Sequence, residues 1–226
     1  MKKIICLLLA VCAMLVFVSC GECETHVDEN KDGVCDECEA SVELPGAAIF
    51  KMVAEAEPTV IATIASTTID DVSYTSDYTT YIYSADSYKH EFNIERPAGP
   101  DDDSDSAVVK VPGVVEYAEG VYKLNGEIVA EAPVVEYLDV CNNINAENVT
   151  SFSVDKSGKT MTATLTKAQC KAIFGVEPDA DNISLTITTN GVRLTKITLN
   201  YTRTSGVIVT SETSYSYAPH STEGAE

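Results

Sequence analysis

A short segment near the amino terminus contains the residues whose types and spacing are most typical of a specific chemistry. It reads GECETHVDENKDGVCDECEA and covers residues 21–40. Carboxylate, thiolate and imidazole groups are the main protein ligands of hard and borderline metal ions. Two overlapping ligand sets occur in this segment, and each favours a different metal.

The first ligand set fits a calcium loop. The pattern D-x-N-x-D-G-x5-E begins at Asp28, and Gly33 permits the sharp turn that such a loop needs. Two features do not fit a calcium loop. No helix has room to flank it, because only residues 21–27 lie between Cys20 and the loop and Pro45-Gly46 soon follow it, and Cys35 replaces the usual aliphatic residue. The predicted oxygen ligands are Asp28, Asn30, Asp32, Val34 through its carbonyl, Asp36 directly or through water, and Glu39.

The second ligand set fits tetrahedral zinc. It consists of the pairs Cys23-x2-His26 and Cys35-x2-Cys38, and paired x2 spacings are typical of structural zinc sites. The gap of eight residues between the pairs is short but can wrap a small knuckle. A complete set of four ligands leaves no open coordination position, so the predicted role of the metal is structural rather than catalytic.

Two further interpretations of this segment need no metal. Cys23 can form a disulfide with Cys35 or Cys38, which an oxidising compartment favours. The segment can also be an acidic spacer with unbonded thiols. A segment this short has no hydrophobic core of its own, so a metal or a disulfide is what would stiffen it.

The residues before this segment follow the plan of an export signal. Lys2 and Lys3 precede an apolar run from Ile4 to Val18, which is shorter than the roughly 20 apolar residues that span a bilayer. Ser19 directly before Cys20 resembles the lipobox of bacterial lipoproteins, although Phe17 stands where that family usually has Leu. The resemblance implies that residues 1–19 are removed and that Cys20 carries the lipid. The alternative is ordinary cleavage nearby with Cys20 as a plain thiol.

The lipobox resemblance also implies a location and an arrangement of segments. We expect an exported protein held by Cys20 at the outer face of the cell membrane, with residues 20–44 as a stalk, residues 45–217 as one β-rich domain and residues 218–226 as a polar tail. Removal of the signal segment changes the net charge from −20 to about −22. Such a surface repels nucleic acid, so we expect no nucleic-acid partner, and we expect a monomer.

The predicted domain begins with one helix and continues as strands. A helix starts at Pro45, places Ile49, Met52, Val53 and Ala56 on one face, and stops before Pro58. From Thr59 the apolar residues alternate with period two, and an acidic loop over residues 96–106 interrupts the series. The predicted strands are 59–69, 72–84, 88–95, 107–111, 114–117, 120–124, 127–130, 149–154, 160–165, 183–189, 192–201 and 207–217.

Several local signals in the second half of the chain refine this prediction. A short helix is expected over residues 137–143, and Thr166 with Gln169 forms a capping box for another helix that ends at Gly175. Asn125-Gly126 is a favoured hairpin turn. The apolar phase slips at Thr195-Lys196, which predicts a β-bulge. The predicted fold class is therefore α+β and mostly β: a curved antiparallel sheet with one amino-terminal helix and short interposed helices.

This order of elements resembles the half-barrel of LolA-like exported lipoproteins. The resemblance covers residues 45–217 but includes no residue motif, so no functional residue is transferred. It implies a sheet that wraps an apolar cavity for acyl chains. Leu185, Ile187, Leu194 and Leu199 would then line that cavity, or else belong to an ordinary packed core.

No motif indicates an enzyme. The chain lacks GxSxG, HExxH and a phosphate-binding glycine loop, and nothing local links Cys141 or Cys170 to His90. Cys141 and Cys170 can form a disulfide or be small buried residues. Two classes of function remain: a binding module for an apolar or lipid ligand, and a surface interaction or structural protein that uses an exposed tyrosine-rich strand, Tyr74–Tyr83.

The metal hypotheses give a direct prediction. Native mass spectrometry of the protein, with and without a chelator, should show the mass of one bound zinc or calcium ion that the chelator removes. Cys38→Ser should abolish zinc binding and leave calcium binding intact, because the sulfur belongs only to the zinc set. A mass that is unchanged by the chelator and corresponds to the bare chain would contradict both metal hypotheses.

Overall fold

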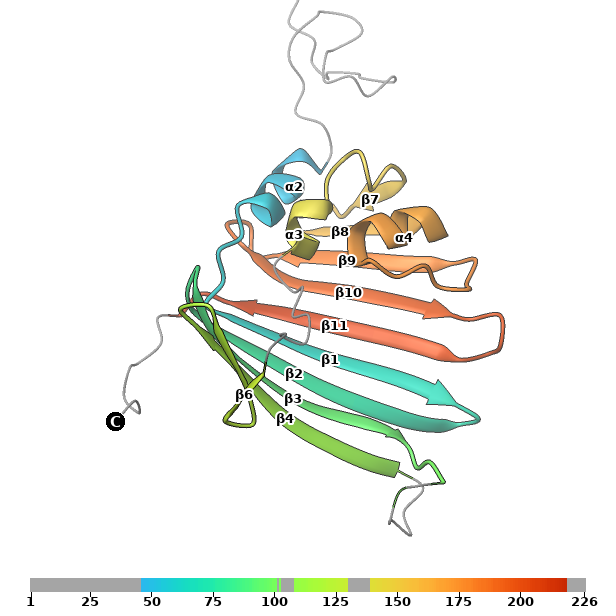
Figure 1. Ribbon diagram of the computed structural model, residues 1–226. Coiled ribbons are helices and arrows are strands. Elements are labelled where there is room, and N and C mark those ends of the chain that lie inside the picture. The colour runs from blue at the N-terminus through green and yellow to red at the C-terminus, as the bar shows by residue number, and fades with distance from the viewer. Residues whose placement is uncertain (1–45, 101, 103–107, 130–138, 219–226) are drawn as a thin grey trace, which may run out of the picture. The chain divides into compact units, whose positions relative to one another are not determined.

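The computed structural model describes residues 46–100, 102, 108–129 and 139–218 of the chain (Figure 1). The predicted signal segment, Cys20, every candidate metal ligand and residues 219–226 lie outside these residues, so the interpretations of them stay predictions. The helices are α2 (Ala47–Ala54), α3 (Asp139–Asn143) and α4 (Lys167–Phe174). The strands are β1 (Val60–Ile69), β2 (Val72–Ser84), β3 (Ser87–Pro97), β4 (Val108–Ala118), β5 (Val121–Leu124), β6 (Glu127–Val129), β7 (Phe152–Val154), β8 (Thr160–Leu165), β9 (Ile183–Thr189), β10 (Leu194–Thr202) and β11 (Ile208–Ser216).

All eleven described strands belong to one antiparallel sheet. Their order is β6-β5-β4-β3-β2-β1-β11-β10-β9-β8-β7, so neighbours in the sheet are neighbours in the chain except where β1 pairs with β11. The sheet is curved and does not close, since β6 and β7 form its two edges (Figure 1). The predicted fold class, mostly β with a curved antiparallel sheet and short helices, is confirmed.

The pairing of β1 with β11 joins two separate meanders. It runs from the Val60–Ser216 pair to the Thr68–Ile208 pair, so every rung connects residues about 140 or more positions apart. Thr59 extends the junction, because its amide donates to the Ser216 carbonyl over 2.8 Å and its hydroxyl donates to the Ala218 carbonyl over 2.6 Å. The sequence patterns predicted only pairs of consecutive strands, so they did not predict this junction.

The three helices pack on one face of the sheet, which we call the inner face (Figure 1). Helix α2 contacts β9 and β10, and α4 contacts β8. Ile49 and Val53 of α2 and Ile173 of α4 are almost fully buried in this layer. Facing them, the inner residues of β8, β9 and β10 form the centre of the core: Met161, Ala163, Leu165, Ile183, Leu185, Ile187, Leu194 and Ile197.

Three local predictions are confirmed in detail. The Thr166 hydroxyl accepts from the Gln169 amide, the Gln169 side chain accepts from the Thr166 amide, and Gly175 ends α4 with a φ of 71°. The pairing of β9 with β10 shifts between Leu194 and Lys196, which is the predicted bulge. Asn125 and Gly126 both have positive φ values, as their hairpin turn requires.

The prediction of two short strands at residues 107–111 and 114–117 is wrong. The structure has one strand, β4, which passes through Pro112 and Gly113. Proline is tolerated there because β5 pairs with β4 only from Val115 onward. No strand of the described residues lies beside Pro112 on that side of β4, so no N–H is needed there to donate to a neighbouring strand. Gly113 is needed because a Cβ at this position would overlap the ring of Phe92 on the neighbouring strand.

The strand predicted over residues 149–154 is shorter than expected. Only residues 152–154 are extended, as β7. The Asn145 side chain accepts from the amides of Glu147 and Asn148, and the Val149 amide donates to the Asn145 carbonyl. These bonds form a turn over residues 145–149, so the chain enters the sheet later than the apolar pattern suggested.

The core predicts a large contrast between two isoleucines. Ile187 is fully buried on β9, whereas Ile128 on the edge strand β6 is 75% exposed. Ile187→Ala should lower the free energy of unfolding by about 2–5 kcal/mol because it leaves a cavity, and Ile128→Ala should change it by about 0.5 kcal/mol or less. Urea denaturation measures both values, and equal losses would contradict the described core.

Candidate functional site: the inner face of the sheet

A small apolar pocket opens on the inner face where the helix layer ends. Its volume is about 150 Å³, and it lies between the sheet and helices α3 and α4. An apolar cavity of this size can hold a benzene-sized group. The lining residues come from five elements: Ile61 and Thr63 of β1, Val140 of α3, Phe174 of α4, Ile197 and Leu199 of β10, and Ser211, Thr213 and Tyr215 of β11.

The pocket exists because the inner face changes composition at β11. Across β8, β9 and β10 the inner residues are large and aliphatic, and the helices bury them. On β11 and β1 the inner residues include Ser211, Thr213 and Thr63, which are too small to fill the same depth. The Thr63 and Thr213 hydroxyls are 3.0 Å apart and hydrogen-bond each other. A ligand in the pocket therefore has fewer hydrogen bonds to supply to these two hydroxyls.

Beyond the pocket, the inner face continues across β2, β3 and β4 as an aromatic panel. The register places Thr63 opposite Tyr78, Tyr78 opposite Phe92, and Phe92 opposite Gly113, so all four lie on the same face. The His90 ring lies 6.1 Å from Tyr78 and 5.9 Å from Phe92 between ring centroids. Tyr88, Tyr117 and Tyr122 form a second row, with centroid distances of 5.3 and 4.4 Å. We define the aromatic panel as the six residues Tyr78, Tyr88, His90, Phe92, Tyr117 and Tyr122.

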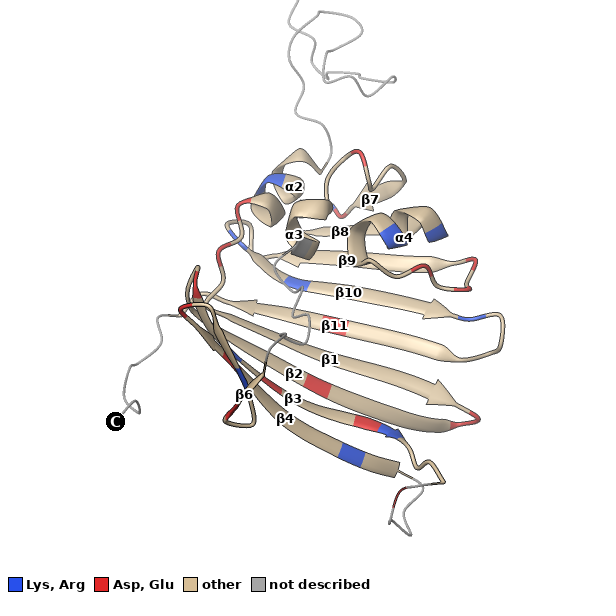
Figure 2. Ribbon diagram, viewed as in Figure 1, with Lys and Arg blue, Asp and Glu red and all other residues tan. Residues whose placement is uncertain are grey.

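The strands around the pocket present an uncharged inner face. Strands β1, β8 and β9 contain no charged residue, and Figure 2 shows most charges at turns and strand ends. The charged residues of β2, β10 and β11 lie on the outer face: Asp77, Lys196 and Glu212. Lys196 and Glu212 form an ion pair of 2.8 Å there. The inner face around the pocket therefore suits an apolar ligand rather than an ionic one.

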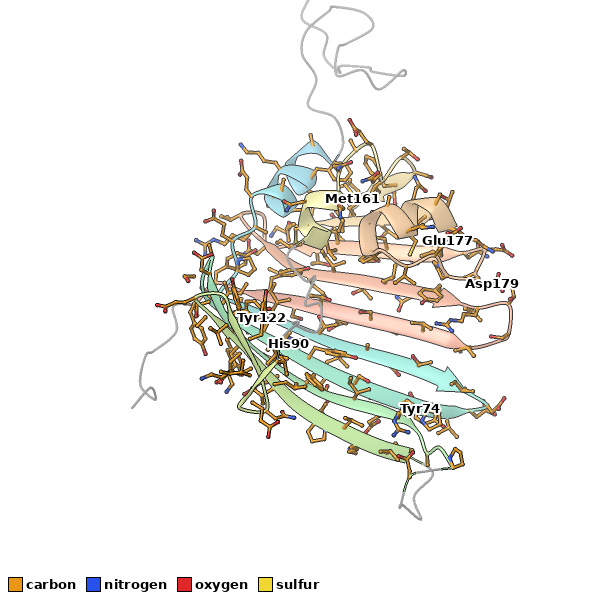
Figure 3. The ribbon with its side chains drawn as sticks, in the orientation of Figure 1. Tyr74, His90, Tyr122, Met161, Glu177 and Asp179 are labelled. Carbon is orange, nitrogen blue, oxygen red and sulfur yellow. The ribbon has the colours of Figure 1, made fainter. Side chains whose placement is uncertain are left out.

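His90 adds a polar group to the panel without adding a charge. Its side chain is buried on β3, and Nδ1 lies 3.0 Å from the Thr80 hydroxyl (Figure 3). Burial lowers the pKa of His90 below its usual value of 6.5, because the charged imidazolium loses hydration. His90 is consequently neutral at neutral pH.

The two described cysteines are also neutral and form no disulfide. The Cys141 thiol donates to the Tyr215 hydroxyl over 3.8 Å, beside the pocket, and burial raises the pKa of both groups. Burial raises the pKa of Cys170 to about 11. Thiols in this state are poor nucleophiles, and Cys170 fits the interpretation of a small buried residue.

The four residues predicted to line a cavity or a core occupy two environments. Leu185, Ile187 and Leu194 are fully buried beneath the helices, and Leu199 is partly buried and lines the pocket. Sequence reasoning missed Ile61, Tyr215 and Phe174. The alternation in the first and last strands indicated two faces, but it contained no signal that these strands would pair and bring Ile61 beside Tyr215.

The candidate calcium and zinc ligands lie outside the described residues. Among the residues that the structure describes, no group of three or more His, Cys, Asp or Glu side chains is placed to hold a metal. The described helices are likewise too short or too polar to cross a membrane.

No protein-family model matches the chain. No curated protein matches it either. Among solved structures, LprF from Mycobacterium bovis is 10% identical to this chain. The match covers 76% of this chain and 93% of LprF, with a TM-score of 0.39. The Mycobacterium tuberculosis lipoprotein LppX is 11% identical, and the match covers 78% of this chain and 97% of LppX, with a TM-score of 0.35. A DUF1329 family protein from Desulfovibrio piger is 10% identical, and the match covers 79% of this chain and 92% of that protein, with a TM-score of 0.25. Likenesses at these scores determine neither a fold family nor a ligand.

Burial of His90 predicts a pH-dependent stability. Below about pH 6.5 the unfolded chain binds a proton at His90 that the folded chain resists, so acidification favours unfolding. The free energy of unfolding should fall between about pH 7 and about pH 5, and His90→Gln should reduce that fall. Urea denaturation at several pH values measures the effect. His220→Gln in the tail is the control, and an equal slope in all three proteins would contradict the assignment.

Proposed function

We propose that this protein is an exported, membrane-anchored lipoprotein that binds an apolar ligand, such as an acyl chain, on the inner face of its sheet. The observation that supports the proposal most strongly is the uncharged pocket at the end of the helix layer, continuous in register with the aromatic panel. Small-molecule sites are concave and mostly apolar, with few polar groups that fix orientation. Here those groups are the hydroxyls of Ser211, Thr213 and Thr63.

The size of the pocket limits how a ligand can bind. A volume of about 150 Å³ holds only the end of an acyl chain, so the rest of the chain must lie along the adjoining inner face. Burying each 100 Å² of apolar ligand surface there would contribute roughly 2.5 kcal/mol. The rings of Tyr78 and Phe92 are half-buried and can contact such a chain.

The anchor and the absence of enzyme activity are parts of the same proposal. Cys20 would carry the lipid, and residues 20–44, with or without calcium or zinc, would hold the domain near the membrane. Neutral His90 and the high pKa values of Cys141 and Cys170 favour binding over catalysis.

The alternative of a surface interaction protein receives less support. Tyr74 and Tyr78 lie on the inner face of β2, whereas Tyr81 and Tyr83 lie on the outer face, so the tyrosines do not form one patch. Tyr83 is 56% exposed and supplies the most accessible ring of this strand.

A matched pair of substitutions tests the apolar site. Ser211 faces the pocket and Thr210 faces the other side of the same strand, so Ser211→Leu fills the pocket while Thr210→Leu does not. Fluorescence titration with a fatty acid that carries an environment-sensitive dye should show saturable binding to the unmodified protein. Ser211→Leu should weaken it at least tenfold, which corresponds to about 1.4 kcal/mol.

Thermal unfolding of both variants shows whether the fold is retained. Thr210→Leu should bind the dye-labelled fatty acid as the unmodified protein does. The proposal would be rejected if the unmodified protein took up no probe, or if both variants bound it equally well.

A further inference from the structure

A second pocket lies at a corner of the domain, away from the aromatic panel. It forms where the end of α2, the turn between β9 and β10, and the residue after β11 meet, and its volume is about 320 Å³. Three charged side chains line it, Glu55, Glu57 and Arg193, together with Met52, Val192 and Tyr217. This volume lies within the range of small-molecule sites.

Arg193 is held in place by an aromatic ring. Its guanidinium carbon lies 4.9 Å from the centroid of the Tyr217 ring, which is a cation–π contact. Among the described residues, no carboxylate lies within ion-pair distance of Arg193, although two glutamates line the same pocket. A guanidinium that stacks on a ring keeps its N–H donors at its edge, where an anionic group can accept from them.

Tyr217 supplies the ring that holds Arg193, while its hydroxyl is enclosed by the protein. Its hydroxyl oxygen is buried, and within the described part of the chain it has no hydrogen-bond partner. Burial raises the pKa of Tyr217, so the hydroxyl remains protonated. The buried hydroxyl interacts with Cys141 and Tyr215 on the interior side, so Tyr217 serves the pocket through its ring and not through its hydroxyl.

The other wall of the pocket is acidic. Glu55 caps the end of α2 and Glu57 follows it, and the carbonyls at this end of the helix add partial negative charge. Glu55 is paired only loosely, with Lys51 at 4.0 Å on an exposed surface. This wall therefore attracts a cation, opposite the guanidinium of Arg193.

We propose that this pocket binds a small zwitterion. Its carboxylate or phosphate accepts hydrogen bonds from the Arg193 guanidinium, and its primary ammonium group contacts Glu55 and Glu57. Both a free small molecule and the head group of a lipid have this chemistry. The site shares no lining residue with the apolar pocket, so it does not depend on the proposed function.

Isothermal titration calorimetry of the full-length protein tests this proposal. The probes are phosphoethanolamine and β-alanine, each compared with its separate charges, ethanolamine and inorganic phosphate or acetate. At least one zwitterion should bind with one-to-one stoichiometry and at least tenfold more tightly than either of its parts. Dihexanoyl phosphatidylethanolamine separates the two sources: tighter binding than phosphoethanolamine indicates a lipid head group, and equal or weaker binding a free molecule.

Two pairs of variants assign the residues. Arg193→Gln should weaken zwitterion binding at least tenfold, while Arg203→Gln, at an exposed position between β10 and β11, should not. Glu57→Gln should weaken it as well, with the exposed Glu147→Gln as its control. Circular dichroism verifies that each variant is folded. The proposal is overturned if neither zwitterion binds, or if Arg193→Gln and Arg203→Gln have equal effects.

Discussion

The antiparallel pairing of β1 with β11 is the interaction on which the rest of the structure depends. It links the meander β1–β6 to the meander β7–β11, and without it the chain would form two small sheets, each with an additional open edge. The pairing also makes the inner face continuous, because Ile61 lies opposite Tyr215 and Thr63 opposite Thr213. Both proposed sites lie close to this junction, since Tyr215 lines one pocket and Tyr217 lines the other.

The helices cover only part of the inner face, and this division organises the domain. Over β8, β9 and β10 they exclude water from large aliphatic residues, and that layer provides most of the hydrophobic stabilisation. From β11 onward the inner face has small hydroxyl residues and then aromatic rings, which tolerate partial exposure better than leucine or isoleucine. A surface of this kind can release and bind an apolar molecule without unfolding the core.

Charged side chains lie away from the inner face around the apolar pocket. The chain has a net charge of −20, yet the charged residues of β2, β10 and β11 lie on the outer face. Buried ionisable groups near the pocket, His90 and Cys141, stay neutral because burial disfavours their charged forms. Arg193 is one of several cations on this acidic surface, and its position over Tyr217 gives the corner pocket its capacity to hold an anionic group.

Local rules allowed much of the fold to be predicted from the sequence. Period-two alternation located most strands, and the capping box at Thr166 and the phase slip at Thr195-Lys196 were correct in detail. These features depend on neighbours within a few residues, so a single sequence contains them. The strand through Pro112 and Gly113 was missed because it depends on which side of β4 lacks a partner and on the ring of Phe92.

The sequence by itself determined the mostly β fold class, the order of the helices and strands, and the hypotheses about Cys20 and residues 23–39, which the described residues do not include. Only the tertiary structure decided that the first and last strands pair, that Leu185, Ile187 and Leu194 are buried while Leu199 borders a pocket, and that Arg193 stacks on Tyr217. The physical reason is range. Strand and turn preferences act over a few residues, whereas a pocket forms from side chains that are far apart in the chain and meet only when the sheet is complete.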